Sequence, residues 1–320
     1  TGMATNLNES TLPATDGVIY HLAVTAADVA NNIIVVGDPE RVPKIAELVF
    51  DKEKNIFRKD HRGLCVMTGY TKGDGMRLSV ITHGMGTGSA EIVLNEILAL
   101  KAIDIKTRTP IEVKEPVNII RIGTSGALQE TTKLGTSIIT KYSIGLDNTG
   151  LFYDIPAQSE EVLELEKIVD GLFNKAVSDS CRYKGCIHAY VSCPDPRMVD
   201  AIERASKKNG LLHKLGITTT VPGFFNCQGR LLFEELPETV ESIDKLLNFN
   251  FHGVQPENLE MEVSILSLIS SGLKWVRFGA ICMAIANRRL NTFASDVESS
   301  LDPTVLTAVD ALREMSKVPL

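Results

Sequence analysis

The stretch RLSVITHGMGTGSAEIVLNEILAL, residues 77–100, decides the fold class of this chain. It opens on Arg77–Thr82, an apolar and β-branched run that predicts a buried strand, and the glycines that follow predict a turn. From about Ser89 onward apolar side chains recur at helical spacing, at Ile92, Val93, Ile97 and Leu100. A strand, a glycine turn and a helix in succession form the repeating unit of an α/β protein.

Similar units lie on both sides of this stretch. Asn32–Val36 reads as a buried strand that ends at Gly37, and Val117–Ile122 reads as another that ends at the glycine loop 123–126. Helices are predicted near residues 159–176, 196–208, 258–271 and 303–315. No internal repeat or low-complexity tract interrupts the pattern, so we expect one α/β domain over residues 18–320, with helices covering a sheet.

The composition is that of an ordinary globular protein, with 44% hydrophobic residues, 23% charged residues and a net charge of -7. Basic residues are spread along the chain, so neither nucleic acid nor a membrane surface is an expected partner. Neither a membrane-spanning run nor a secretory signal pattern is present, which predicts a cytoplasmic protein. Thr1 and Gly2 ahead of Met3 look like an expression scar, and we expect residues 1–17 to form a disordered tail.

The six cysteines are widely spaced and mostly have apolar neighbours, which favours reduced core thiols over a disulfide framework. Cys181, Cys186, His188 and Cys193 could in principle supply four ligands to zinc. However, they lack CxxC spacing, and Arg182–Ser192 reads as a strand whose alternate side chains would point to opposite faces. No metal site is therefore predicted.

Two turns carry groups that bind anions. The sequence GDPER at 37–41 places a flexible glycine amide and a guanidinium four residues apart, and RIGTSG at 121–126 combines an arginine at a strand end with a hydroxyl in a glycine loop. Either turn alone is equally well explained by a tight turn with a solvated arginine. Gly84, Gly86 and Gly88 lack GxGxxG spacing and no GxxxxGK[ST] motif is present, so neither a nicotinamide cofactor nor ATP is predicted.

Several motifs follow one another along the chain: His21, GDPER at 37–41, RIGTSG at 121–126, QGR at 228–230, NLEME at 258–262 and Asn287-Arg288. In this order and spacing they resemble the uridine phosphorylase branch of the nucleoside phosphorylase family, from about His21 to the C-terminus. The HGMG turn and the chain length are more similar to the eukaryotic members. The resemblance implies a single-domain, three-layer α/β fold with a central mixed, twisted sheet flanked by helices.

The resemblance also implies a reaction, the phosphorolysis of uridine to uracil and ribose 1-phosphate, in which inorganic phosphate attacks C1′ through an oxocarbenium-like transition state. Phosphate is then a co-substrate, and no cofactor is expected. Gly37, Arg41, Arg121 and Thr124 match the family's phosphate site, and Arg62 matches an arginine that the neighbouring subunit supplies. Several cations around one anion would catalyse by orientation and electrostatics.

Three residues match the family's ribose site. Glu262 would accept hydrogen bonds from ribose hydroxyls, Met261 would pack against the sugar, and His21 of a partner chain would reach the 5′-hydroxyl. Because His21 and Arg62 would act across an interface, we expect a homodimer as the smallest active unit. Without the resemblance, the acids Glu260 and Glu262 are better explained as a solvated helix start.

The base site follows from the same resemblance. Gln228, whose amide can donate and accept, matches the N3 and O2 edge of uracil, and Arg230 would hold O4. Negative charge builds on these carbonyls as uracil leaves, so Arg230 and Arg288 would stabilise the transition state. Phe224 would stack on the base and Gly126 would border it. The residues expected to carry catalysis are Arg121, Glu262, Arg230 and Gln228.

Some positions depart from the family pattern. Gly63 stands where bacterial members have an acid that holds a metal ion at the subunit interface, so no ion is predicted there. The stretch Phe225-Asn226-Cys227 and the small Ala286 leave base selectivity open. The apolar Phe224, Phe225 and Cys227 nevertheless predict a partly buried setting for Gln228.

Two alternatives stay open. A purine nucleoside phosphorylase of the same fold would need an acid near the purine N7, where this chain has Asn287. A non-catalytic nucleoside-binding paralogue would keep the fold without turnover, although a binder would not need the full set of phosphate-binding residues. Uridine phosphorolysis is the function that the sequence favours.

Overall fold

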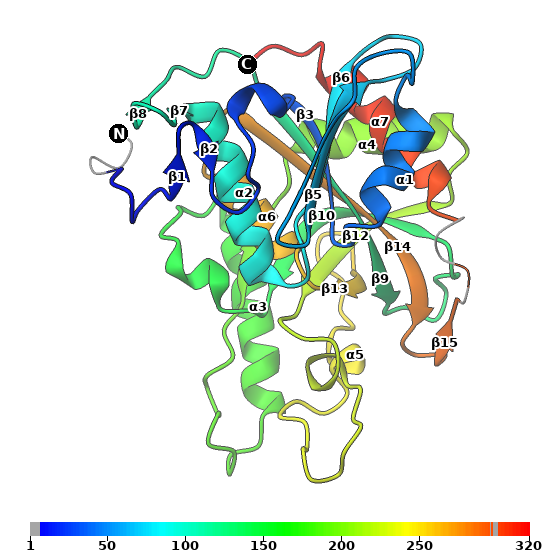
Figure 1. Cartoon of the computed structure of the whole chain (residues 1–320). Coiled ribbons are helices and arrows are strands. Elements are labelled where there is room, and N and C mark those ends of the chain that lie inside the picture. The colour runs from blue at the N-terminus through cyan, green and yellow to red at the C-terminus, as the bar shows by residue number, and fades with distance from the viewer. Residues whose placement is uncertain (1–6, 295, 297–299) are drawn as a thin grey trace.

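The computed structural model describes residues 7–294, 296 and 300–320. A large sheet lies at its centre, with helices packed against both faces (Figure 1). The α-helices of the described residues are α1 (Arg41–Val49), α2 (Thr87–Ala102), α3 (Glu160–Ala176), α4 (Pro196–Lys208), α5 (Ile243–Leu246), α6 (Val263–Ser271) and α7 (Asp302–Met315). None of these helices combines the length and apolar character needed to span a bilayer.

The central sheet is mixed and, within the described residues, has eleven strands. They are β3 (Asn32–Val36), β4 (Phe57–His61), β5 (Leu64–Tyr70), β6 (Arg77–Thr82), β9 (Val117–Ala127), β10 (Ser137–Gly145), β11 (Tyr190–Ser192), β12 (His213–Thr220), β13 (Pro256–Glu260), β14 (Val276–Asn287) and β15 (Thr292–Phe293). Strands β9, β14, β10, β12 and β13 pair in a closed ring, and β3, β6, β5 and β4 extend the sheet from β9. Strand β9 is therefore the junction of the two parts.

Strand β3 shows why its sequence is an unbroken apolar run. Ile34 and Val36 pack in the core under α1, α4 and α7, whereas Ile33 and Val35 pack in the core under α2 and α6. Alternate side chains of a strand point to opposite faces, so a strand with helices on both sides needs apolar residues at every position. The predicted central mixed sheet flanked by helices is confirmed.

The best-predicted elements are those with the strongest local patterns. Strands β3 and β6 have the predicted bounds, and α2 begins at Thr87 near the predicted start. Helices α3, α4 and α7 lie where their periodicity predicts them. The start of α3 is fixed locally, since the Ser159 side chain accepts a hydrogen bond from the backbone N–H of Val162.

Two predicted boundaries are wrong. The glycine loop expected at 123–126 is part of β9, because β9 pairs with β14 in parallel up to Ala127. The helix expected over 258–271 begins at Val263, and residues Pro256–Glu260 instead form β13 between β12 and β9. In both cases the pairing partner comes from a distant part of the chain, so local sequence carries little of the signal.

The strand expected over Arg182–Ser192 is also wrong for most of its length, because the chain makes turns there before the short strand β11 at Tyr190–Ser192. Cys181 and Cys193 are partly buried and Cys186 is exposed, all as free thiols. Within the described ranges, no group of three or more His, Cys, Asp or Glu side chains is arranged to hold a metal ion.

The described part of the N-terminal segment, from residue 7, differs from the expected disordered tail. Leu12 packs into the core, and residues 14–15 form a small hairpin, β1 (Ala14–Thr15) with β2 (Val18–Ile19). The guanidinium of Arg108 donates hydrogen bonds to the backbone carbonyls of Asn8 and Leu12, at 3.1 and 2.6 Å. Arg108 lies next to β8 (Thr109–Pro110), which pairs with β7 (Ile103–Asp104), so distant residues anchor this segment. Thr1 and Gly2, expected to be an expression scar, lie outside the described residues.

Tyr190 on β11 shows how closely the elements pack beside the closed ring of strands. Its hydroxyl lies 2.6 Å from the Asp147 carboxylate and 2.9 Å from the Ser264 hydroxyl. A Cβ added to Gly145 on β10, or to Gly150 in the 3-10 helix η2 (Thr149–Phe152), would lie 2.4 Å from the Tyr190 ring. The two hydrogen bonds hold the aromatic ring of Tyr190 in place, so both glycines are needed to make room for this side chain.

We expect Gly145→Ala to lower the free energy of unfolding by about 1–3 kcal/mol, because the new methyl group forces the fixed Tyr190 ring to move. Gly171→Ala in α3 is the control: an added Cβ there meets nothing, and alanine favours the helix by roughly 0.5–1 kcal/mol. Urea unfolding of both variants checks this. Equal stability of the two variants would contradict the packing argument.

Candidate active site

A cavity of about 720 Å³ opens where several strands of the sheet end. Strands β3, β6, β9, β13 and β14, or the turns that follow them, border it, and the loop around η3 (Asn226–Gln228) closes one side. Most of the predicted site residues line it: Gly37, Arg41, Arg62, Arg121, Thr124, Gly126, Phe224, Gln228, Arg230, Met261 and Glu262. Segments that are far apart in sequence are thus brought to one place, as expected for ligand binding at strand ends.

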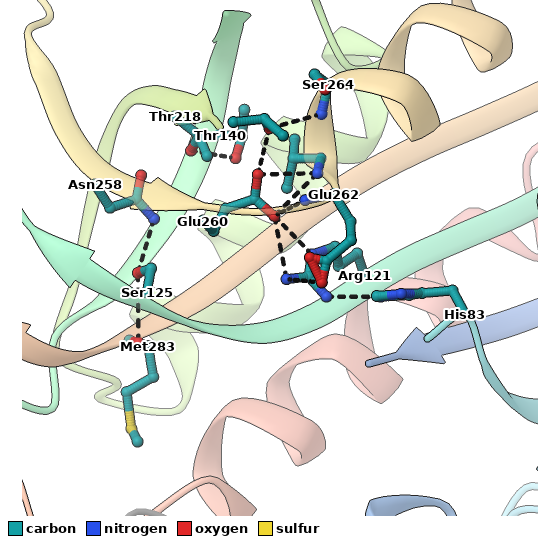
Figure 2. Close-up of polar contacts among 12 residues, drawn as sticks. His83, Arg121, Ser125, Thr140, Thr218, Asn258, Glu260, Glu262, Ser264 and Met283 are labelled. Carbon is teal, nitrogen blue, oxygen red and sulfur yellow. Dashed lines mark hydrogen bonds and ion pairs between the residues drawn. The ribbon is translucent and has the colours of Figure 1, made fainter. Parts of the chain in front are cut away.

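Arg121 is the centre of the polar contacts at this cavity (Figure 2). Its side chain, 4% exposed, lies on β9 with Nε 3.2 Å and Nη2 3.1 Å from Oε2 of Glu260 on β13. Nη2 is also 3.6 Å from Oε1 of Glu262, and Nη1 is 2.6 Å from Nε2 of His83. Burial alone would lower the pKa of Arg121, but the carboxylates of Glu262 and Glu260 outweigh it and raise the pKa. Arg121 is therefore a permanent cation with partners along most of its guanidinium.

Glu260 joins this cation to the start of helix α6. Its carboxylate accepts hydrogen bonds from the backbone N–H groups of Glu262 and Val263, at 2.7 and 2.9 Å, and from the Thr220 hydroxyl. These are first-turn N–H groups, which have no partner within the helix and favour a negative charge. Glu260 is 3% exposed and Glu262 6%, so the explanation of this pair as a solvated helix start is wrong.

Glu262 has an oxygen to offer to a ligand. Oε1 lies near Arg121, but Oε2 is buried with no hydrogen-bond partner among the described residues, while the side chain lines the cavity. Burial raises the pKa of Glu262 to about 7, since the opposing effect of Arg121 is partly offset by the negative charge of Glu260. An unpaired buried acceptor is costly unless something binds it, so Glu262 is suited to accept a hydrogen bond from a ligand.

Arg41 and Arg62 add positive charge to the cavity wall. Arg41 is the first residue of α1, directly after the turn at Gly37. Arg62 is exposed in the turn between β4 and β5, with a left-handed φ of 53°, and its Nη1 lies 3.5 Å from the Tyr20 hydroxyl. It borders the cavity of its own chain, while the expectation that it serves a neighbouring subunit stays a prediction.

The side chains expected to hold a base contact one another. The Gln228 side-chain oxygen accepts a hydrogen bond from Arg230, and its Nε2 donates to the Gly223 carbonyl at 3.0 Å. The Arg230 guanidinium lies 3.9 Å from the centroid of the Phe224 ring. Burial, with help from the positive charge of Arg288, lowers the pKa of Arg230 to about 10.

Gln228 is buried, in line with the partly buried setting expected for it. Its apolar neighbours are more accessible, since Phe224 and Phe225 are about half exposed (47% and 50%) and Cys227 is exposed. They belong to a loop in which the backbone N–H groups of Gln228 and Arg230 both donate to the Phe225 carbonyl. Local apolar composition does not reveal this.

Three residues named from the sequence do not line the cavity in this chain. The Nη2 of Arg288 donates a hydrogen bond to the backbone carbonyl of Gln228 at 2.6 Å. His21 lies 2.7 Å from Oε2 of Glu96 on α2. Asn287, weighed as the counterpart of a purine-protonating acid, instead donates its side-chain N–H groups to the carbonyls of Gln129 and Thr132. Asn287 therefore has a structural role, and its identity says little about purine selectivity.

His83 is a site residue that sequence reasoning did not single out. It follows β6 directly within the HGMG turn, is fully buried and contacts Arg121. The signal in the sequence that could have pointed to His83 is a histidine directly after a buried strand, within a glycine turn. The contact with Arg121 joins residues 38 positions apart, so nothing in the turn itself predicts it.

Gly123 gives Arg121 the space to fold back against β9. A Cβ added at this position would lie 2.6 Å from Nη2 of Arg121. We expect Gly123→Ala to displace the guanidinium and weaken binding of inorganic phosphate by roughly tenfold to a hundredfold, the worth of one charge-assisted hydrogen bond. Gly88→Ala, where an added Cβ meets nothing, is the matched control. Isothermal titration with phosphate measures both, and unchanged affinity in Gly123→Ala would contradict this role of the glycine.

Known proteins match most of this chain. Residues 32–316 match the family model of the phosphorylase superfamily. A uridine phosphorylase of Thermococcus kodakarensis is 26% identical over 93% of this chain and 88% of its own length. A DeoD-type purine nucleoside phosphorylase of Caldanaerobacter subterraneus is 35% identical, over 37% of this chain and 44% of its own length.

A solved structure extends the similarity to the whole fold. The Trypanosoma brucei nucleoside phosphorylase, described as showing uridine phosphorylase activity, superimposes with a TM-score of 0.83 at 28% identity. The match covers 95% of this chain and 99% of that protein. The strands and turns that carry the cavity residues fall within the residues that the family model matches. The chain belongs to the phosphorylase superfamily.

Proposed function

We propose that this protein is a uridine phosphorylase. The carrying observation is a single cavity that holds three arginines, a buried carboxylate with a free oxygen, and an amide paired with a guanidinium. In the proposed reaction a phosphate oxygen forms a bond to C1′ of uridine as the bond from C1′ to N1 breaks. The bonding electrons leave with uracil, which takes up a proton, and ribose 1-phosphate is the second product.

The arginines suit the nucleophile. Arg41, Arg62 and Arg121 line the cavity together with the Gly37 turn and Thr124. Phosphate is bound by charge and by directed N–H groups, so its position relative to the sugar is fixed before reaction. Inorganic phosphate is the co-substrate, and the reaction requires no cofactor.

Glu262 suits the sugar. Its Oε2 can accept a hydrogen bond from a ribose hydroxyl, which would satisfy the buried oxygen. When ionised it also stabilises the positive charge that develops on the ring as the glycosidic bond breaks. Met261 lies next to it on the cavity wall and provides an apolar contact.

Gln228 and Arg230 suit the base. The Arg230 side chain already donates a hydrogen bond to the Gln228 side chain. Binding of uracil would exchange this contact for contacts with O2, N3 and O4 of the base. The guanidinium then meets the negative charge that builds on the leaving uracil, an interaction that grows toward the transition state. Phe224, already stacked against Arg230, offers a ring face at the same place.

The test of the function is ultraviolet monitoring of nucleoside cleavage. We expect release of uracil from uridine that strictly requires phosphate, and cleavage of inosine at least roughly tenfold slower in kcat/KM, because an amide and a guanidinium fit the uracil edge. A preference for inosine would favour a purine nucleoside phosphorylase, which the partial match to a DeoD-type enzyme also makes worth testing. Uridine binding without cleavage would favour a non-catalytic binder.

A homodimer is part of this proposal. Tyr20, Met85, Leu151 and Phe152, here called the α2 face, are exposed apolar side chains, with Met85 and Phe152 each 84% exposed. Exposed apolar side chains gathered on one surface are typical of an interaction site. They lie around α2, because η2 contacts α2 and because His21, next to Tyr20, bonds to Glu96 of α2.

A second copy on the α2 face would meet the mouth of the cavity. Met85 belongs both to this face and to the cavity wall, and Arg62 of the wall contacts Tyr20 of the face. Arg62 and His21 are thus beside the surface where a partner would dock, which supports their action in the neighbouring site. An isologous dimer would complete both sites in the same way.

Mixed dimers test this exchange. Arg62→Ala and Glu262→Gln should each be inactive alone, but a mixed dimer contains one site with both native residues if Arg62 acts across the interface. We expect random mixing of equal amounts to restore about one quarter of the wild-type sites. Absence of recovery in a confirmed mixed dimer would show that Arg62 serves its own chain, whose cavity it borders.

A further inference from the structure

His83 is buried between β3 and the Arg121 cluster. Its backbone N–H donates to the Val36 carbonyl at 2.8 Å, and its carbonyl accepts a hydrogen bond from the Ser89 hydroxyl at 2.7 Å. The backbone on both sides of the ring is therefore fixed. The side chain is fully buried, in contact with the charged cluster of the cavity (Figure 2).

The neighbours of the ring determine its tautomer. Nδ1 lies 2.7 Å from the carbonyl oxygen of Gly84, which can only accept, so Nδ1 carries the proton. Nε2 lies 2.6 Å from Nη1 of Arg121, which can only donate, so Nε2 presents its lone pair. Burial, reinforced by the positive charges of Arg121 and Arg41, lowers the pKa of His83 well below its usual value. The ring is neutral and acts as an acceptor.

This acceptor completes the support of the Arg121 guanidinium. Nε and Nη2 face the carboxylates of Glu260 and Glu262, and Nη1 faces His83. A guanidinium has five N–H bonds, two of them on Nη1, so contact with His83 leaves the second Nη1 hydrogen for a ligand. Without His83, the Nη1 end of the group would have no hydrogen-bond partner in this cluster.

The neutrality of this acceptor matters as much as its position. Arg121 already faces two carboxylates, those of Glu260 and Glu262. A third carboxylate in place of the imidazole would add negative charge beside the arginine that is to bind phosphate, and like charges in a buried site repel strongly. A neutral ring holds the guanidinium without weakening its attraction for an anion.

We propose that His83 is a positioning residue for phosphate, acting through Arg121. Its Nε2 lone pair fixes the rotation of the guanidinium, so that the remaining Nη1 hydrogen is directed at the anion, and its neutrality preserves the positive potential there. The proposal rests on the proposed phosphorolysis of uridine. It predicts a defect in phosphate use, with uridine binding nearly unaffected.

Three variants that differ in the acceptor and in the charge at position 83 test this proposal. His83→Gln keeps a neutral acceptor near the position of Nε2, His83→Glu keeps the acceptor but adds charge, and His83→Leu removes it. We expect His83→Leu to raise KM for phosphate about tenfold and KM for uridine less than about twofold. His83→Gln should recover most of this loss, whereas His83→Glu should be at least as impaired as His83→Leu.

Several outcomes would overturn the proposal. A folded His83→Leu with unchanged KM for phosphate, an equal rise in both KM values, or a His83→Gln as impaired as His83→Leu would each do so. If His83→Leu does not fold, the pair His83→Gln and His83→Glu decides, and equal KM values for phosphate would refute the charge argument. Titration with inorganic phosphate separates this proposal from the function itself: a wild type that binds phosphate but does not cleave uridine refutes only the proposed reaction.

Discussion

The buried ion pair between Arg121 and Glu260 is the interaction on which the rest of the site depends. It joins β9 to β13, two neighbouring strands of the closed ring, and Glu260 also accepts the first backbone N–H groups of α6. Burying charges is costly unless each is paired and fully hydrogen-bonded, and here strand, helix and side chains all contribute partners. The orientation of the guanidinium is thus fixed before any ligand arrives, which is the condition for electrostatic catalysis.

The closed ring of strands makes this arrangement possible. β9 pairs with β14 along one side, and with β3 and then β13 along the other, so a side chain on β9 can meet groups from several strands of the sheet. At Gly123 the missing Cβ lets the Arg121 side chain lie against its own strand. The cavity forms at the edge where these strands end, and its wall combines rigid strand residues with the exposed loop that carries Gln228.

Phosphorolysis of a nucleoside places opposite demands on one cavity, since an anion must be bound while positive charge develops on the sugar. In the proposed reaction the site would meet these demands by placing positive and negative groups at separate positions. The carboxylate of Glu260 compensates the charge of Arg121. Arg41 and Arg62 add further positive charge, and Glu262 keeps an unpaired oxygen. The neutral imidazole of His83 completes the cluster without shifting this balance, which is why a histidine suits the position better than an acid.

The sequence by itself determined the α/β class and the bounds of β3 and β6, and most of the site residues that it named line the cavity. These rest on short-range signals: apolar runs such as Asn32–Val36, helical periodicity, and motifs whose residues lie close together in the chain. The tertiary structure alone decided that β9 continues to Ala127 and that β13 precedes α6, because both depend on pairing with distant strands.

The same reason separates the site residues that were found from those that were not. Arg121 and Glu262 were named from their motifs, but their burial, the link through Glu260 and the contact with His83 join residues up to 139 positions apart. The anchoring of residues 7–14 by Arg108 and the partial exposure of Phe224 are likewise outcomes of the tertiary structure. Local patterns name the groups, and the packing of distant segments decides which of them touch, which are buried and which keep a free atom for a ligand.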